Sequence, residues 1–582
     1  MKYSRSVFIV LLIALALTSV AGQTDLKEKA RKEEERKQLL ERQTFALVEQ
    51  IAADTSSLKL PENRLFLLAE TAELMWAHDQ KRARSIFLDA FNNLTLLTIP
   101  SQNKDPKKQR DEILFSTFTL RSELLLRIAR RDSQFALDLL RSVAPIPPDL
   151  SQRYFLPDLE QQIVAEAAYR DPQLTLKLGR EVLAKKLTHE VLNTLFRLNY
   201  LDQELGSKFA GEIIAKLQTR DLSSDQVASG IASDLLISSR PPKSSFALGG
   251  RGGLKLTGEQ RRQLVDMIAT AILGLSGNGA LLHAVSDIMP EIEEFAPERA
   301  ALLQRKAVAF NETLNKEQKD WRQFNSLVRN GTPEEILAAA QQTSNSEQRR
   351  MLQQQAVVTA VMHNRADSFR NYLENELKDE GVRKDLIDAL DAEQINGSVN
   401  KGDAEALRKL LSRARLKEQR ARSMAELAIL LEKKGDHEEA LKLLDEAQDL
   451  LKYDFSSDTQ TNALLALVAA YALVEPARAF AIIEAAIDRA NDQITKLLLL
   501  DKIMKTGVVK SGEIILRNSG ILSEFVMLRY GSALAALANF DFDRTKAIAD
   551  RLQRNELRIY ARKIMAQGLL QQQQLNQIKD NQ

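Results

Sequence analysis

The sequence predicts an all-α fold, an α-α superhelix (solenoid) of irregular two-helix repeats. Three observations lead to this prediction. Apolar residues recur at helical spacing from about Phe45 onward, and no stretch alternates with the period of two that a half-buried strand requires. In addition, one apolar template follows a series of turn-forming residues along the chain. The first two observations indicate helices, and the third indicates that the helices repeat.

The template begins four residues after a turn residue and places apolar side chains at positions i, i+3, i+4 and i+7. These positions form one stripe along a helix, and an Asp or Thr ahead of the stripe can cap the free backbone N–H groups. The residues that open and close the stripe are often alanine, which lets another helix approach closely. The clearest copies follow Asp79 (Ala83, Ile86, Phe87, Ala90), Asp132 (Ala136, Leu139, Leu140, Val143), Gly206 (Ala210, Ile213, Ile214, Leu217), Asp403 (Leu407, Leu410, Leu411, Ala414), Asp436 (Ala440, Leu443, Leu444, Ala447) and Glu475 (Ala479, Ile482, Ile483, Ala486), with looser copies after Asp171, Thr332 and Asp541.

The spacing of the turn residues supports a repeat of two helices. Asp132 and Asp171 are 39 residues apart, Asp171 and Gly206 are 35 apart, and Asp403 and Asp436 are 33 apart. Two-helix solenoid repeats have periods of ~34 residues in one class and ~40 or more residues in another. Asp367 is an exception, because Phe369, Tyr372 and Leu373 are out of phase with the template.

The N-terminus predicts export. Lys2 and Arg5 precede an apolar run from Val7 to Leu17 and a stretch of small residues that ends at Gly22, which is the order found in a secretory signal peptide. The apolar run is shorter than the ~20 residues that span a bilayer. We therefore expect cleavage after Ala21 and a periplasmic or secreted protein without an integral membrane span, the alternative being an uncleaved signal anchor. The chain has no cysteine that could carry a lipid.

Composition shifts predict the domain organisation. Residues 1–21 form the signal peptide, and residues 22–44 are a charged lead-in helix or arm. An N-terminal helical-repeat array covers residues 45–240, a Pro/Gly-rich loop covers residues 241–257, and a C-terminal array covers residues 258–582. Helices are expected to begin near Gly258 and near Pro297.

Composition also excludes several classes of function. The absence of cysteine rules out disulfides, thiolate metal sites and thiol nucleophiles. Without Lys2 and Arg5, 79 of the 81 basic residues remain against 79 acidic residues, so the mature chain is formally neutral. This balance gives no indication of binding to nucleic acid or anionic lipid.

Metal and catalytic motifs are incomplete. His189-Glu190 begins like a zinc-protease helix, but Asn193 replaces the second histidine, and His283 has only Asp287 one turn away. Surface or packing roles are therefore expected for His189 and His283, and a turn position is expected for His437. None of the five histidines has another histidine nearby in the sequence; they are His78, His189, His283, His363 and His437. Ser276 lies in the segment from Gly274 to Gly279, which lacks the final glycine of a nucleophile elbow.

Two charged clusters are open to a functional interpretation. Glu291, Glu293 and Glu294 could form an acid-base pair, but without a desolvated setting they are expected to face solvent. The loop from Gly249 to Gly253, with neighbouring basic residues, could bind phosphate or RNA, but a plain surface loop is expected. The basic residues are Arg240, Lys243, Arg251 and Lys255. No catalytic, cofactor-binding or metal-binding residue is predicted.

One unit, residues 424–451, resembles a tetratricopeptide repeat. The matching positions are Leu427, Ala428, Gly435-Asp436, Ala440 and Ala447, where that family keeps a leucine, small residues and a turn. The resemblance implies a right-handed superhelix with a concave groove that binds peptides or protein segments. It assigns no ligand-contacting residue, because the matching positions are packing positions.

These observations predict an exported, non-enzymatic scaffold that binds a protein or peptide partner in the bacterial envelope, with no cofactor. Two alternatives remain open. One is a cell-wall or glycan-acting enzyme built on a helical superhelix or toroid. The other is an architectural component that associates with itself.

Overall fold

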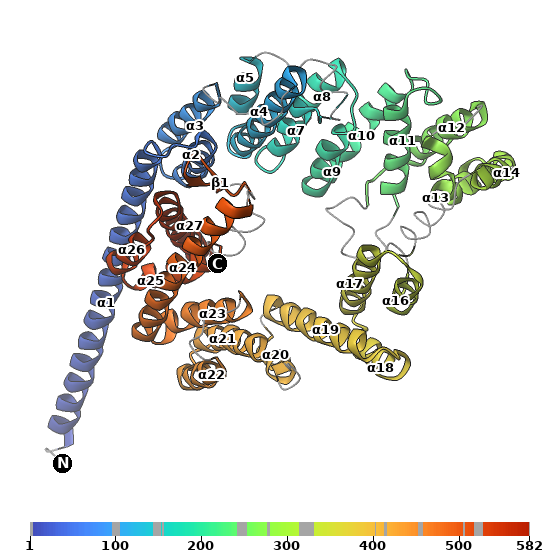
Figure 1. Ribbon diagram of the computed structural model, residues 1–582. Helices are drawn as coiled ribbons and strands as arrows, with labels where there is room; N and C mark the ends of the chain where they lie inside the picture. Colours follow the sequence, from blue (N-terminus) through green and yellow to red (C-terminus); the bar gives the residue numbers. More distant parts are fainter. Residues whose placement is uncertain are drawn as a thin grey trace. The chain divides into compact units, whose positions relative to one another are not determined.

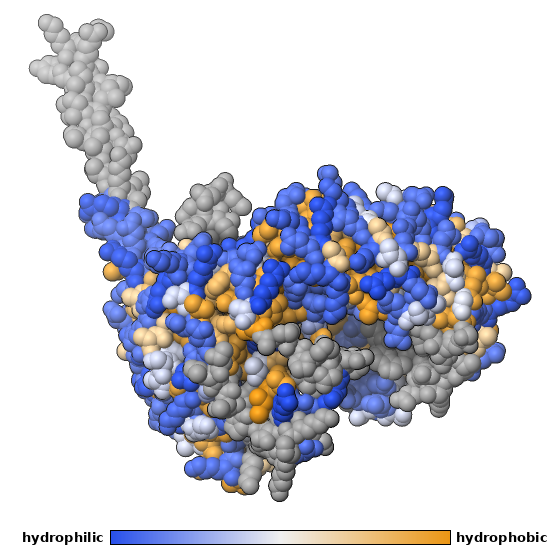
Figure 2. Space-filling view, turned by 90° about the horizontal axis from the view of Figure 1, so that it is seen from above, coloured by the Kyte–Doolittle hydropathy of each residue, from blue (hydrophilic) through white to orange (hydrophobic). Residues whose placement is uncertain are grey.

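The computed structural model confirms the all-α solenoid (Figure 1). It describes residues 4–95, 105–143, 153, 156–240, 253–275, 280–313, 327, 331–401, 403–411, 416–451, 458–504, 507–516 and 528–580, in places by the backbone alone. Within these residues the only strands are β1 (Val509–Lys510) and β2 (Glu513–Ile514), which pair antiparallel. Hydrophilic residues cover most of the face seen in Figure 2, with hydrophobic residues exposed between them.

The chain divides into two compact units. Unit 1 comprises residues 1–93 and 353–582, and unit 2 comprises residues 94–352. Helices α3 (Gln80–Thr95) and α17 (Ser346–Met362) cross the boundaries between them. The other helices of unit 1 are α1 (Ser4–Thr55), α2 (Pro61–Met75), α18 (Ala366–Glu376), α19 (Glu380–Lys401), α20 (Ala404–Leu411), α21 (Lys417–Lys433), α22 (His437–Leu450), α23 (Asp458–Val474), α24 (Pro476–Met504), α25 (Leu528–Phe540), α26 (Phe542–Asp550) and α27 (Asn555–Asp580). Those of unit 2 are α4 (Pro106–Ala129), α5 (Ser133–Arg141), α7 (Leu159–Ala167), α8 (Pro172–Lys185), α9 (Val191–Leu201), α10 (Gln203–Leu217), α11 (Gln226–Ser238), α12 (Gly258–Gly274), α13 (Ala280–Phe295), α14 (Pro297–Thr313) and α16 (Pro333–Gln342).

Most of the turn residues that locate the template are helix caps. The carboxylates of Asp132, Asp171 and Asp541 each accept a hydrogen bond from the backbone N–H three residues later. Thr332 forms a capping box with Glu335, in which each side chain binds the other residue's backbone N–H. The caps fix where each helix begins, and therefore which of its faces the apolar stripe occupies.

The turn at Gly435-Asp436 ends α21 by a different route. Gly435 has a φ of +87°, in the left-handed region that glycine tolerates without strain. Its N–H binds the carbonyl of Glu432, and the N–H of Asp436 binds the carbonyl of Leu431. This pair of bonds is the Schellman motif, and it explains why glycine precedes Asp436 at this turn.

The stripes are buried, as the template predicts. Ala83, Ile86, Phe87 and Ala90 of α3 are between 0 and 1% exposed. The corresponding residues of α22 and α24 are also buried, and in α5 the stripe is buried at Ala136 and Leu139 but only half-buried at Leu140. The helices expected near Gly258 and Pro297 are α12 and α14, and both begin at those residues.

The interpretation of Gly206 as a turn residue was wrong. Gly206 lies inside α10, and the cap is Asp202, whose carboxylate accepts from the N–H groups of Glu204 and Leu205. A Cβ added at Gly206 would lie 2.6 Å from the Cα of Asn199 in α9. Glycine is present because two helix backbones approach closely here, and the template then runs from Asp202 through Gly206 to Phe209 and Ala210.

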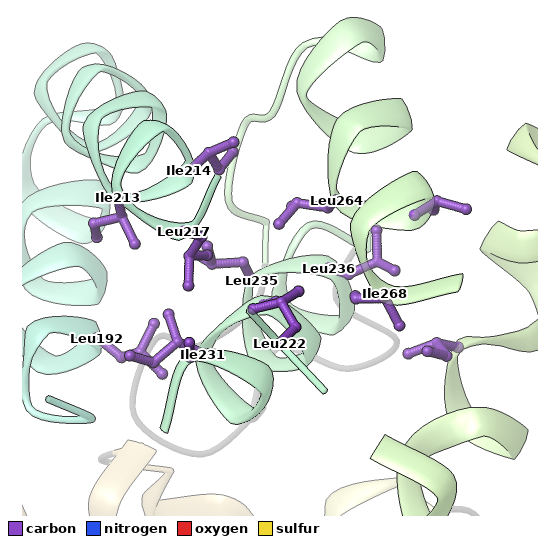
Figure 3. Packing of buried hydrophobic residues seen from close by; sticks show 14 of the residues in the cluster. Leu192, Ile213, Ile214, Leu217, Leu222, Ile231, Leu235, Leu236, Leu264 and Ile268 are labelled. Carbon is purple, nitrogen blue, oxygen red and sulfur yellow. The ribbon is translucent and has the colours of Figure 1, made fainter. Parts of the chain in front are cut away.

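Unit 2 is built from two layers of helices. In one layer, α4 packs against α7 and α7 against α9. In the other layer, α8 packs against α10 and α10 against α12. The core runs through both layers without a break from α8 to α14. Figure 3 shows part of this core, to which α10 contributes Ile213 and Leu217, α11 contributes Leu235, and α12 contributes Ile268.

Unit 1 has the same two-layer construction. Helices α21, α23, α25 and α27 pack in succession, and α24 packs on α26 beside them. Helices α25 and α27 lie so close that a Cβ added at Gly531 would overlap Ile564, and one added at Gly568 would overlap Ala535. Tyr471 of α23 is fully buried, and burial raises the pKa of its phenol to about 12.

Ion pairs join neighbouring helices of the α20, α22, α24 and α26 layer. Glu439 of α22 pairs with Arg408, Asp445 of α22 with Arg478, and Glu484 of α24 with Arg544. Each pair is largely exposed, so each contributes at most about 1 kcal/mol. Much of the charge on this surface is therefore used for contacts within the chain.

The two ends of the chain meet within unit 1. α27 packs against α1 and α2, and polar contacts come both from α27, where Arg562 pairs with Asp54, and from the β1–β2 hairpin. The Glu513 carboxylate accepts from the backbone N–H groups of Lys59 and Leu60, at 2.5 and 2.9 Å. The Asn63 amide donates to the Ile514 carbonyl at 2.8 Å and accepts from the Leu516 N–H at 2.9 Å. Glu513 therefore caps α2, whose own N-cap side chain, Leu60, cannot do so.

Several sequence predictions remain as they were. Residues 1–3 and the side chains of residues 4–27 lie outside the description, so the signal peptide is still a prediction. The charged segment that follows is helical, and its side chains from residue 31 to residue 39 are exposed. Residues 241–252 of the Pro/Gly-rich loop also lie outside the described residues. No helix in the described ranges has the length and apolar character needed to cross a membrane.

Candidate functional site

Three consecutive repeats of unit 2 carry a large side chain at the same place. Arg130, Tyr169 and Tyr200 each precede the capping aspartate of their repeat by two residues, the caps being Asp132, Asp171 and Asp202. They lie at the C-terminal ends of α4, α7 and α9, which pack side by side. Tyr169 is 61% exposed and Tyr200 is 73% exposed. We call this set, together with Glu166 and Arg197, the α4–α7–α9 edge.

The exposure of the two tyrosines follows from the helical stripe. Ala167 and Ala168 of the α7 repeat are buried at 4 and 0% exposure, and Leu198 of α9 is fully buried. A residue one or two positions after a buried residue on a helical turn points about 100° or 200° away from it. Tyr169 and Tyr200 are therefore directed out of the core by the same register that buries their neighbours.

A buried carboxylate ties the three repeats together. Glu166, five residues before its cap, has a side chain only 9% exposed and pairs with Arg130 at 3.2 Å and with Arg197 at 2.9 Å. A carboxylate in this position needs charged partners to offset its desolvation. Glu166 thus fixes one arginine from the preceding repeat and one from the following repeat.

Arg197 also holds an aromatic ring in place. Its guanidinium carbon lies 5.2 Å from the centre of the Tyr169 ring, within the range of a cation–π contact. Arg170 and Leu201 are exposed beside the two tyrosines. The result is a surface in which Glu166 and Arg197 fix the Tyr169 ring, with the exposed Tyr200 ring on the neighbouring helix.

The residue types of the edge suit binding rather than chemistry. Tyrosine and arginine are enriched at the centres of protein interfaces, because each offers a large apolar area together with a polar group. Fixing the side chains before binding lowers the entropy cost of association.

Unit 2 has a second interhelical carboxylate away from this edge. Glu160, in the first turn of α7, pairs with Arg141 of α5 at 2.6 Å and with Lys185 of α8 at 3.0 Å. Burial alone would raise the pKa of Glu160, but the two hydrogen bonds hold it below its ordinary value. This carboxylate therefore joins α5, α7 and α8.

The structure does not bring the histidines together. His78 stacks on Phe45 with the ring centres 3.7 Å apart, and His437 contacts Glu432 at 3.0 Å. His189 and His363 are exposed at separate places in the chain, and the His283 and Asp287 side chains lie outside the description. Within the described residues, no three or more His, Cys, Asp or Glu side chains are placed to hold a metal.

The expectation that Glu291, Glu293 and Glu294 all face solvent was wrong for Glu291. Glu293 and Glu294 are exposed, whereas Glu291 is 8% exposed and forms a bidentate ion pair with Arg240. Arg240 is one of the basic residues beside the glycine-rich loop, so its charge is engaged within unit 2. Lys255 is exposed, while Lys243, Arg251 and Ser276 lie outside the described residues.

The α4–α7–α9 edge was not predicted from the sequence. The available signal was the spacing of Tyr169 and Tyr200 from their caps, two residues in each case. That spacing becomes visible only when Asp202, rather than Gly206, is taken as the cap of α10. With Gly206 as the reference, Tyr200 falls at a different position from Tyr169, and the pattern is lost.

The comparisons with known proteins do not assign a family. No protein-family model and no curated protein sequence matches the chain. Among solved structures, the chain is similar to a circular tandem repeat protein with novel repeat topology and enhanced subunit contact surfaces. The two are 13% identical, the match covers 91% of this chain and 99% of the other, and the TM-score is 0.13. At this TM-score the similarity carries no information about function.

Proposed function

We propose that this chain is an exported, non-enzymatic helical-repeat scaffold of the bacterial envelope or exterior, and that it binds a polypeptide partner at the α4–α7–α9 edge. The observation that carries the proposal is the pair of exposed tyrosines, Tyr169 and Tyr200, at the ends of neighbouring helices. The Tyr169 ring is held by a cation–π contact with Arg197, and Arg197 is paired with the buried Glu166. Surface aromatic rings that are fixed by charged neighbours are typical of interaction hot spots.

Two further features support the proposal. The resemblance of residues 424–451 to a tetratricopeptide repeat implies a fold family that binds peptides or protein segments. The apolar run from Val7 to Leu17 behind Lys2 and Arg5 supports export. The non-enzymatic character rests on the side chains of the edge, which supply contact area and hydrogen bonds but no reacting group.

Replacing both tyrosines should abolish most of the binding. The purified chain is mixed with a bacterial envelope extract, crosslinked, and assayed for retained polypeptides. The Tyr169→Ala, Tyr200→Ala double variant is expected to retain at least about tenfold less of the partner, because truncating each hot-spot tyrosine costs more than about 1 kcal/mol and about 1.4 kcal/mol corresponds to tenfold in affinity.

A matched control separates this effect from a general loss of exposed apolar area. Val308 and Met351 are 54 and 55% exposed in unit 2, away from the edge in sequence. The Val308→Ala, Met351→Ala variant should retain as much partner as the wild type. Equal retention by the tyrosine variant and the wild type, or no retention by either, would refute the proposal.

A further inference from the structure

The C-terminal end of α24 carries an exposed apolar face. The first part of the helix is anchored in unit 1, where Ala479, Ile483 and Ile494 are buried. Beyond Ile494 the pattern reverses, and four large apolar side chains face solvent. They are Leu499 (56% exposed), Leu500 (51%), Ile503 (78%) and Met504 (68%).

These four residues share one side of the helix. Residues four positions apart are neighbours on a helix surface, so Leu499 lies beside Ile503 and Leu500 lies beside Met504. The opposite side is directed inward. Leu497 and Leu498 are half-buried, and the Asp501 carboxylate accepts a hydrogen bond from the Val508 N–H at 3.1 Å. The helix end is therefore held in place with its apolar face outward.

Two lysines accompany the apolar face. Lys496 and Lys502 are exposed on the same two turns, and neither forms an ion pair within the described part of the chain. By contrast, Arg478 at the start of α24 and Arg544 of α26 each pair with a carboxylate of the preceding helix of their layer. The only acid in this stretch, Asp501, is turned toward the hydrogen bond with Val508.

We propose that this end of α24 docks onto an anionic lipid surface. Leu499, Leu500, Ile503 and Met504 would enter the boundary between headgroups and acyl chains, and Lys496 and Lys502 would contact the lipid phosphates. A short helical segment with an apolar face and flanking lysines has the features of an interfacial, peripheral attachment. The site is independent of the α4–α7–α9 edge, which lies in the other unit.

Charge distinguishes a lipid surface from a second copy of the chain. Two copies pairing through these apolar faces would bring the flanking lysines of both helices close together, with like charges opposed. An anionic bilayer satisfies the apolar residues and the lysines at once. The formal neutrality of the whole mature chain does not bear on this point, because the attraction is local and decays within a Debye length of about 10 Å.

The test measures partition onto vesicles. The full chain and the chain beginning at Gly22 are both sedimented with vesicles of phosphatidylglycerol and phosphatidylcholine, or of phosphatidylcholine alone. The second form is included because the apolar run from Val7 to Leu17 could itself enter a bilayer. The chain from Gly22 is expected to bind the anionic vesicles at least tenfold more tightly than the neutral ones, and less tightly as salt is raised.

Two variants of the site and one control complete the experiment. Ile503→Asp with Met504→Asp should abolish vesicle binding, and Lys496→Glu with Lys502→Glu should remove the preference for anionic vesicles. Leu302→Asp with Val308→Asp, at 49 and 54% exposure in α14, should bind like the wild type. Circular dichroism melting confirms that each variant is folded.

Three outcomes would overturn the inference. The first is an absence of sedimentation with anionic vesicles, and the second is binding by the Ile503→Asp, Met504→Asp variant that equals wild-type binding. The third is a concentration-dependent dimer, seen by light scattering and lost in that variant, in the absence of vesicle binding. The third result would assign the face to a second copy of the chain.

Discussion

Replacing Gly206 with alanine should destabilise unit 2 by about 2–3 kcal/mol, although alanine is the better helix former by about 1 kcal/mol. The added Cβ would lie 2.6 Å from the Cα of Asn199 and 2.9 Å from its backbone N. Because these are backbone atoms of α9, the steric overlap can be relieved only if α9 and α10 move apart. The melting temperature should fall by several degrees. Partner capture should fall as well, because Tyr200 directly follows Asn199 in α9.

Gly397 offers the matched control for Gly206→Ala. It also lies inside a helix, α19, but an added Cβ would meet nothing within 4 Å. Gly397→Ala should therefore stabilise the protein by about 0.5–1 kcal/mol through the smaller backbone entropy of the unfolded chain. If the two variants changed the melting temperature in the same direction and by the same amount, the close approach of α9 and α10 would be refuted.

Replacing Asn63 with alanine should have the other large effect, a loss of about 2–5 kcal/mol. Asn63 is fully buried, and its amide donates a hydrogen bond to the carbonyl of Ile514 and accepts one from the N–H of Leu516. Removing the amide leaves a buried acceptor and a buried donor without partners, and each such group costs about 1–3 kcal/mol. Chemical denaturation, together with limited proteolysis of the N-terminal segment, measures the loss.

Asn555 provides the comparison within the same contact region. Its amide donates to the Ser57 hydroxyl at 2.9 Å, but the contact is exposed and water can replace it. Asn555→Ala should cost less than about 1 kcal/mol, with unchanged protease resistance of residues 45–75. An Asn63→Ala variant as stable as Asn555→Ala would show that the hairpin does not hold the two ends of the chain together.

The pattern of residues within one helix and its cap was sufficient to predict the helices and their buried faces. A capping aspartate followed by a stripe of small and large apolar residues is visible within about ten residues, so α3, α5 and α8 could be located from the sequence. Gly206 was misinterpreted because glycine is typical both of turns and of close helix contacts, and the sequence around it does not show which neighbour approaches.

Features that depend on distant partners were not predictable. The β1–β2 hairpin has two residues per strand, joined by Ser511-Gly512. Strands of two residues are too short to show an alternating pattern in the sequence. The role of the hairpin depends on Asn63, about 450 residues earlier. Likewise, Glu291 is buried because Arg240 reaches it from 51 residues away. A single sequence carries no information about such pairs.

The α4–α7–α9 edge lies between these two cases. Each of its residues occupies a position that the helical register determines, so the exposure of Tyr169 and Tyr200 was available in principle. The role of Glu166 was not, because a glutamate on a helix surface is ordinarily solvated and its two arginines come from different repeats. Through Arg197, that carboxylate fixes the exposed Tyr169 ring.

Photocrosslinking in living cells tests the partner-binding edge most directly. A photoreactive aromatic amino acid is introduced in place of Tyr169, Tyr200 or, as a control, Met351, and the irradiated cells are examined for adducts. We expect positions 169 and 200 to yield adducts with the same polypeptide and position 351 to yield none. An absence of adducts at 169 and 200, or the same adducts at all three positions, would contradict the proposal that this edge holds a partner.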